Sequence, residues 1–242
     1  MCIRDRTVLF ENFGMMGWKS GNRYTYAEGS PVTNLFMNLK YLIARDNIYM
    51  NTYDLTEVYG VGNVKLLQNN HYLPMGFMTN SALASWQVDE NEDQFNPFDK
   101  QNEFFKLATG IKDDVYTPLD VVSQGHTDYN QFPVNKTGYG RYSFSCNDTT
   151  VTPHVKWNYE APKDGLYLMY ADISGGDDVT VMINDVAQSK TYGMGRSYIA
   201  CIGQCKKGDK ISVYSNLQQG QSGSAMVFVC LLYTSPSPRD TR

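Results

Sequence analysis

The segment VTPHVKWNYEAPKDGLYLMYADISGGDDVTVMI, residues 151–183, decides the fold of the C-terminal half of the chain. Three short stretches within it share an alternation of apolar and other side chains: 151–157, 166–170 and 179–183. Alternation with period two places one set of side chains on one face of a strand, so each stretch predicts a β-strand with a buried face. Gly165 and the pair Gly175-Gly176 separate the stretches, as turn residues do. Short strands at this spacing predict a β-sandwich.

Two further phrases refine the type of sandwich. Trp157-x-Tyr159 followed by Ala161-Pro162-x-Asp164-Gly165 resembles the opening strands of jelly-roll modules. The phrase VTVMIND at 179–185, with GDKISV at 208–213, resembles galactose-binding-like sandwiches. Such phrases specify a fold more than a function. We therefore expect a jelly-roll or galactose-binding-like domain over residues 136–229.

A different pattern precedes the sandwich. Asn96 can cap a helix, Pro97 suits its first position, and Gly110 is a natural stop. Phenylalanines recur between them at helical spacing, which indicates an amphipathic helix that packs on a core. The predicted fold class is therefore α+β and mainly β: a mixed region at 7–135 with one amphipathic helix, then the sandwich. The segment 116–136 could belong to either part.

Shorter elements are expected upstream of this helix. Residues 32–38 predict a short helix or turn, and the apolar run 40–45 predicts a buried strand. Residues 57–69 predict a hairpin that turns near Gly60 and Gly62. A strand at 75–79 would follow, with Pro74 at its entry because proline cannot donate to a ladder.

The amino-acid sequences at both ends of the chain look like translations of adapter DNA. Residues 1–5 and 230–234 can be encoded by strings that are reverse complements of each other, as the mosaic ends of a transposase-based sequencing adapter are. We therefore expect residues 1–6 and 230–242 to be adapter-derived, and we exclude them from fold reasoning. The natural gene is then expected to continue in both directions.

Composition excludes some functions. Lys and Arg number 21 against 25 Asp and Glu, a formal net charge of −4, and no basic patch or stripe predicts nucleic-acid binding. No apolar run reaches the roughly 18 residues that span a bilayer. Cys201 and Cys205 have a weak metal-ligand spacing without a nearby histidine, so no metal site is predicted. Whether these two cysteines form a disulfide is left open.

Candidate catalytic groups are equally sparse. Asp89, Glu90, Glu92 and Asp93 form an acidic cluster that could bind a cation or cleave a glycosidic bond. A solvated loop is the favoured interpretation, because nothing in the sequence fixes the separation of two carboxylates. No Gly-x-Ser-x-Gly nucleophile motif is present. No catalytic residue is therefore predicted in this chain.

Aromatic residues are the remaining candidates for binding. The chain has 18 tyrosines and three tryptophans, a balance that suits a β-rich surface protein in contact with sugars. Trp157, Tyr159 and Trp86 are the candidate carbohydrate-binding residues, since flat aromatic rings can stack on sugar rings. Packing in the core is the alternative interpretation for each of them, and for any single aromatic ring it is the favoured one.

Four motifs resemble one known family. They are Gly29-Ser30-Pro31, NLKYLIAR at 38–45, LPMGF at 73–77 and NPFDKQNEFF at 96–105. Together they resemble the extracytoplasmic region of the bacterial YfhO-type membrane proteins. The resemblance spans most of residues 10–229, and it is most specific over residues 30–110.

The resemblance implies a function for the parent protein. Members are polytopic, GT-C-like glycosyltransferases of the bacterial cell membrane, associated with adding sugars to envelope polymers such as lipoteichoic acid. The implied donor is a polyprenyl-phosphate-linked sugar. The acidic catalytic residue of such enzymes lies on an early outer loop, upstream of Thr7. This chain is then expected to be a non-catalytic, extracytoplasmic fragment that packs on the membrane part of the same chain and orients a glycan or teichoic acid acceptor. The alternative is a secreted carbohydrate-binding or structural surface β-sandwich protein.

Overall fold

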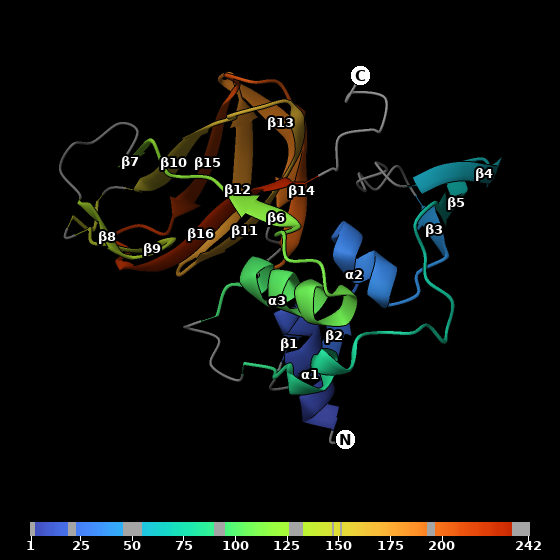
Figure 1. The fold of residues 1–242 in the computed structure, drawn as a ribbon. Coiled ribbons are helices and arrows are strands. Elements are labelled where there is room, and N and C mark those ends of the chain that lie inside the picture. Colours follow the sequence, from blue (N-terminus) through green and yellow to red (C-terminus); the bar gives the residue numbers. More distant parts are fainter. Residues whose placement is uncertain are drawn as a thin grey trace. The chain divides into compact units, whose positions relative to one another are not determined.

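The computed structural model divides the chain into two compact units, residues 1–114 and residues 115–242 (Figure 1). It describes residues 3–18, 23–45, 55–89, 95–125, 133–146, 148–150, 152–192 and 197–233. Each unit has its own elements and core, and each is described by itself.

The first unit combines helices with two small antiparallel sheets. Its helices are α1 (Ile3–Asn12), α2 (Pro31–Phe36), the 3-10 helix η2 (Ser81–Ser85) and α3 (Pro97–Thr109). Its strands are β1 (Met16–Trp18), β2 (Arg23–Thr25), β3 (Tyr41–Arg45), β4 (Leu55–Val61) and β5 (Val64–Asn69). Strands β1 and β2 pair with each other, and the other three form a sheet in the order β3-β5-β4.

Helix α3 confirms the amphipathic helix expected from the sequence. The Asn96 side chain accepts a hydrogen bond from the backbone N–H of Phe98 at 3.0 Å, which satisfies a donor that the first turn leaves unpaired. Pro97 opens the helix, and Gly110 ends it in the left-handed conformation with φ of 77°. Phe98 is only 1% exposed, so the predicted apolar face does meet a core.

A buried polar network joins α2 and α3 to the end of α1. The Ser30 hydroxyl caps α2 by accepting from the Thr33 N–H at 3.1 Å and donates to the Gln101 side-chain oxygen at 2.7 Å. The Gln101 amide and the Thr33 hydroxyl both donate to the carbonyl of Phe13, at 2.8 and 2.9 Å. All of these polar side chains are at least 98% buried. Each buried donor and acceptor in the network therefore has a partner, as stable interiors require.

Aromatic rings pack beside this network. Phe104 of α3 meets Phe13, Phe36 and Trp86 edge to face, with ring centroids 4.8 to 5.3 Å apart. Phe13 also lies 5.6 Å from Trp86. Edge-to-face pairs add to the burial of apolar area, so this cluster is a main part of the first unit's core.

Two expectations for the first unit need correction. The run 40–45 does form a strand, β3, but it is not buried: Tyr41 is 48% and Ile43 69% exposed. Residues 75–79 form no strand. Pro74 cannot donate to a ladder, and the chain is instead tied to α3 by the Asn80 N–H, which donates to the carbonyl of Ala108 at 2.8 Å.

The predicted hairpin is confirmed. Strands β4 and β5 pair antiparallel and turn at Gly62, whose φ of 58° lies in the left-handed region that favours glycine.

The second unit is a β-sandwich, as the sequence predicted. One sheet has the order β13-β12-β15-β10-β7, and the other has the order β14-β11-β16-β9-β8, with β6 also paired to β16. Its strands are β6 (Tyr116–Pro118), β7 (Ser123–Gly125), β8 (Val134–Gly138), β9 (Arg141–Phe144), β10 (His154–Glu160), β11 (Gly165–Ile173), β12 (Gly176–Ile183), β13 (Val186–Tyr192), β14 (Ile199–Cys205), β15 (Lys210–Leu217) and β16 (Gly223–Leu232). Every pairing is antiparallel.

The segment 116–136, which the sequence left open, pairs within the sandwich. Strand β6 pairs with β16, and β7 pairs with β10. The residues expected to be adapter-derived are continuous with regular elements where they are described: 3–6 belong to α1 and 230–232 to β16. Their origin concerns the DNA and stays a prediction.

Within the described ranges, no helix is both long enough and apolar enough to cross a membrane.

Replacing Gln101 by alanine tests the polar network. The change leaves the Ser30 hydroxyl and the Phe13 carbonyl short of partners and opens a cavity, so we expect the free energy of unfolding to fall by about 2–4 kcal/mol. Urea unfolding followed by circular dichroism measures it. Glu103→Gln, on the exposed side of the same helix, is the matched control and should change stability by no more than about 0.5 kcal/mol. Equal effects of the two changes would contradict the network.

Candidate functional site

Strand β16 has two different partners along one edge, and this leaves a gap in its sheet. Its residues 223–226 pair with β9, whereas residues 230–232 pair with β6. Single backbone hydrogen bonds hold the ends of the gap: the Val227 N–H donates to the Gly140 carbonyl at 2.9 Å, and the Leu119 N–H donates to the Val229 carbonyl at 2.8 Å. The sheet is therefore open between β6 and β9.

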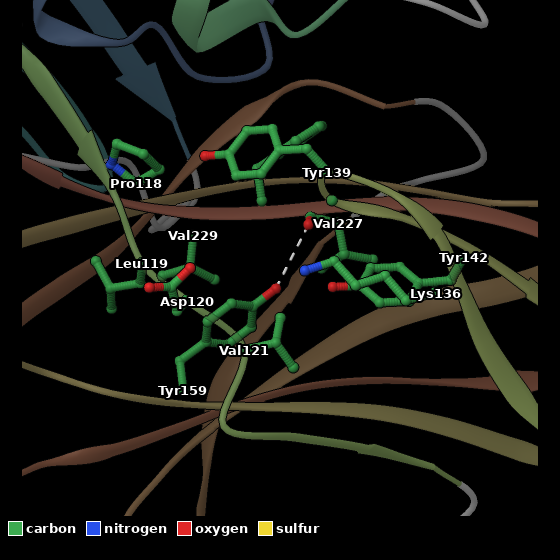
Figure 2. A pocket seen from close by; sticks show the side chains of 12 residues that line it. Pro118, Leu119, Asp120, Val121, Lys136, Tyr139, Tyr142, Tyr159, Val227 and Val229 are labelled. Carbon is green, nitrogen blue, oxygen red and sulfur yellow. Dashed lines mark hydrogen bonds between the residues drawn. The ribbon is translucent and has the colours of Figure 1, made fainter.

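A pocket occupies this gap, and we call it the β16 pocket. Its volume is about 280 Å³ when the open mouth is included. The polar side chains in its lining come from five places in the sandwich: Asp120 from the β6–β7 loop, Lys136 from β8, Tyr139 from the turn before β9, Tyr142 from β9 and Tyr159 from β10 (Figure 2). The apolar lining includes Val227, Phe228 and Val229 of β16.

Two tyrosine hydroxyls lie deep in the pocket. Tyr159 crosses from the other sheet and donates to the Val227 carbonyl at 3.4 Å, which is long for an O–H···O bond. The pKa of Tyr159 is raised well above its ordinary value. Burial is the largest cause, and the proximity of Tyr142 is the second. Burial also raises the pKa of Tyr142. Both groups are therefore neutral hydroxyls at physiological pH, able to donate and to accept.

The turn between β8 and β9 sets the mouth of the pocket. Gly140 has φ of 61°, and a Cβ there would lie 2.1 Å from the Phe228 ring. Only glycine allows this close approach, which brings Tyr139 beside Phe228 with ring centroids 5.6 Å apart. Tyr139 is 49% exposed, so part of its ring is open to solvent at the mouth.

The three predicted carbohydrate-binding residues are buried or half-buried, and they lie in both units. Trp157 and Tyr159 both point inward from β10, with 0% and 2% of their surfaces exposed. Neither ring has a face open to a sugar, and only the Tyr159 hydroxyl reaches the β16 pocket. Trp86 belongs to the first unit, where its half-buried ring packs on Phe104. Trp86 and the pair Trp157 and Tyr159 thus belong to different units.

Sequence reasoning missed the residues that do converge. Tyr142, Tyr139 and Lys136 share no motif, and their proximity follows from the way β9 and β6 divide the edge of β16. The one available signal was the short polar and aromatic stretch NKTGYGRYSF at 135–144, which has a turn glycine between two strand patterns.

The acidic cluster contributes no site that the structure describes. Glu90, Glu92 and Asp93 lie outside the described residues. The backbone of Asp89 is held by the Asn12 side chain, whose amide donates to the Asp89 carbonyl at 2.9 Å and accepts from its N–H at 2.7 Å. In the described part of the chain, no cluster of three or more His, Cys, Asp or Glu side chains could hold a metal ion.

The fold defines a β-sandwich domain, preceded by a mixed unit, and the described residues of the sandwich form a pocket but no metal cluster. The family model "Bacterial membrane protein YfhO" matches residues 3–227. The chain therefore belongs to this family of bacterial membrane proteins.

No curated protein matches the chain. Among solved structures, a GH26-CBM35 β-(1,4)-mannanase from Podospora anserina is 15% identical, with a TM-score of 0.33 over 52% of this chain and 29% of that one. An exo-β-1,3-galactanase from Phanerochaete chrysosporium is 14% identical, with a TM-score of 0.28 over 48% and 29%. A GH87 α-1,3-glucanase from Streptomyces thermodiastaticus is 9% identical, with a TM-score of 0.27 over 50% and 28%. The chain thus spans under a third of each of these proteins, and similarities of this size carry no argument about function.

Replacing Trp157 by alanine separates a core role from a surface role. Because the ring is fully buried between the sheets, we expect the change to lower the free energy of unfolding by about 3–5 kcal/mol, measured in guanidinium chloride by circular dichroism. Val186→Ala, at an exposed position of the same sheet, is the control and should cost less than about 1 kcal/mol. An unchanged unfolding midpoint in the Trp157 variant would place this ring outside the core.

Proposed function

We propose that this chain is the extracytoplasmic part of a polytopic, GT-C-like membrane glycosyltransferase that adds sugars to a cell-envelope polymer of the teichoic acid type. The observation that carries the proposal is the family match over residues 3–227.

The chemistry of the reaction supports a division of labour. The lipid of a polyprenyl-phosphate-linked sugar lies in the bilayer. The site that breaks the bond between the sugar and the phosphate therefore belongs to the membrane part of the parent chain. The β16 pocket instead contains neutral tyrosine hydroxyls, one exposed lysine and one exposed carboxylate. Such groups hold a ligand by hydrogen bonds and ring contacts, which suits binding and orientation of a polymeric acceptor.

The first unit supports the membrane part as a partner. Apolar side chains are exposed on the sheet β3-β5-β4 and on the loop that follows it: Ile43 at 69%, Val61 at 64%, Met75 at 93% and Met78 at 98%. Exposed apolar patches of this kind mark interaction surfaces. Beside them, the Lys40 amine lies over the rings of Tyr41 and Tyr72, 5.2 and 4.9 Å from their centroids. Lysine with tyrosine is typical of residues at a membrane interface.

The charge of the chain supports the expectation that nucleic acid is not a partner. The formal net charge is −4, whereas nucleic-acid-binding domains present a basic patch or stripe.

One observation favours a second candidate function. The β16 pocket is complete within the sandwich, because every residue of its lining lies between Pro118 and Val229. A secreted carbohydrate-binding protein could therefore use the same pocket with no transferase attached. The two functions differ in what surrounds the sandwich in the parent gene.

Recovery of the parent gene tests the proposal. Long-read sequencing of the source locus across both ends should find many apolar spans upstream of this region, with an acidic residue on an early outer loop. Membranes that carry the full-length parent should then transfer labelled sugar from a polyprenyl phosphate to lipoteichoic acid, and deletion of the region matching residues 7–229 should abolish the transfer. A gene that encodes only a signal peptide and this region would exclude the transferase and favour the secreted protein.

A further inference from the structure

A buried hydroxyl in the β16 pocket lacks a partner. Tyr142 is 1% exposed, and its hydroxyl forms no hydrogen bond with any described residue. A buried polar group left without a partner costs about 1–3 kcal/mol, so native proteins rarely keep one unless something else supplies the bond. Figure 2 shows this hydroxyl pointing into the pocket, toward the same space as the Lys136 amine and the Tyr159 hydroxyl. The pocket is therefore built to receive a polar group at its deep end.

The size of the deep end limits what that group can be. The pocket is shallow: it has room for a group about as large as a water molecule, and the rest of its volume of about 280 Å³ includes open solvent. A single hydroxyl group fits there, whereas a whole ring does not. The body of any larger ligand must then stay at the mouth.

The mouth has balanced charge and an aromatic face. Lys136 and Asp120 are both exposed there and carry opposite charges. An anionic ligand such as a glycerol phosphate would be attracted by one and repelled by the other, whereas a neutral polyol can accept from the amine and donate to the carboxylate. The half-exposed ring of Tyr139 adds a flat apolar surface of the kind that packs on a pyranose ring.

We propose that the β16 pocket binds one neutral sugar unit of a glycan, with one sugar hydroxyl inserted against Tyr142 and the pyranose ring held at the mouth by Tyr139, Lys136 and Asp120. The bound unit is a sugar on the polymer and not its phosphate backbone. The inference deepens the proposed function, and it rests on that function only for the identity of the polymer that carries the sugar.

Titration of the full chain with simple glycosides tests the inference. The probes are the methyl α- and β-glycosides of glucose, galactose, N-acetylglucosamine and N-acetylgalactosamine, with delipidated poly(glycerol phosphate) as the phosphate probe. At least one glycoside should bind with a dissociation constant of about 1 mM, as expected for a shallow site with few hydrogen bonds, and should displace the ring resonances of Tyr142 and Tyr139 in spectra of ¹³C-tyrosine-labelled protein. Poly(glycerol phosphate) should not displace them.

Tyr142→Phe removes the hydroxyl and keeps the ring. It should weaken glycoside binding at least about five-fold without lowering the thermal midpoint of unfolding, because the hydroxyl has no partner in the described structure to lose. Tyr59→Phe, at a 65% exposed position of the first unit, is the matched control and should leave binding unchanged. Tyr139→Ala should weaken binding too, while the protein remains folded.

The outcomes separate this inference from the proposed function. Binding of poly(glycerol phosphate) alone, or of no probe at all, would overturn the inference, even where membranes of the full-length parent transfer sugar. Equal binding by wild type and the Tyr142→Phe variant would also overturn it. Glycoside binding that depends on Tyr142 would uphold it, even if the parent gene encodes no transferase.

Discussion

The pairing of β16 is the constraint on which the larger unit depends. This strand lies between β11 on one edge and the pair β9 and β6 on the other, so it joins three parts of the chain that are distant in sequence. Residues 225–232 of β16 are all buried. Strands β9 and β6 pair with different segments of the same edge of β16. The gap between these two segments is where the pocket lies. The same arrangement that completes the sandwich therefore also creates its candidate binding site.

In the first unit, the side-chain amide of Gln101 likewise joins parts of the chain that are distant in sequence. Gln101 accepts from Ser30 and donates to the Phe13 carbonyl, and these contacts fix α2 and the end of α1 against α3. Two of the sequence motifs that suggested the family, Gly29-Ser30-Pro31 and NPFDKQNEFF, thus meet in one buried network. Glutamine suits this position because its side chain can accept and donate at once, and both partners are buried polar groups.

The sequence predicted those features that depend on neighbours in the chain. The Asn96 cap, the Gly110 stop and the turn at Gly62 follow from local backbone chemistry, and period-two patterns indicated the sandwich. Burial was predicted less well: β3 is apolar but exposed, because burial depends on what covers a sheet and not on the strand itself. The same limit applies to the site. No local pattern shows that Trp157 is fully buried, and the place of Tyr142 depends on pairings that no local pattern contains.

The two most exposed methionines have a chemical consequence. Met75 and Met78 lie almost entirely in solvent, on the apolar loop of the first unit. A thioether in that position is open to oxidants, and its sulfoxide is polar and chiral where the methionine was flexible and apolar. Oxidation would therefore change the character of this surface without touching the core of either unit.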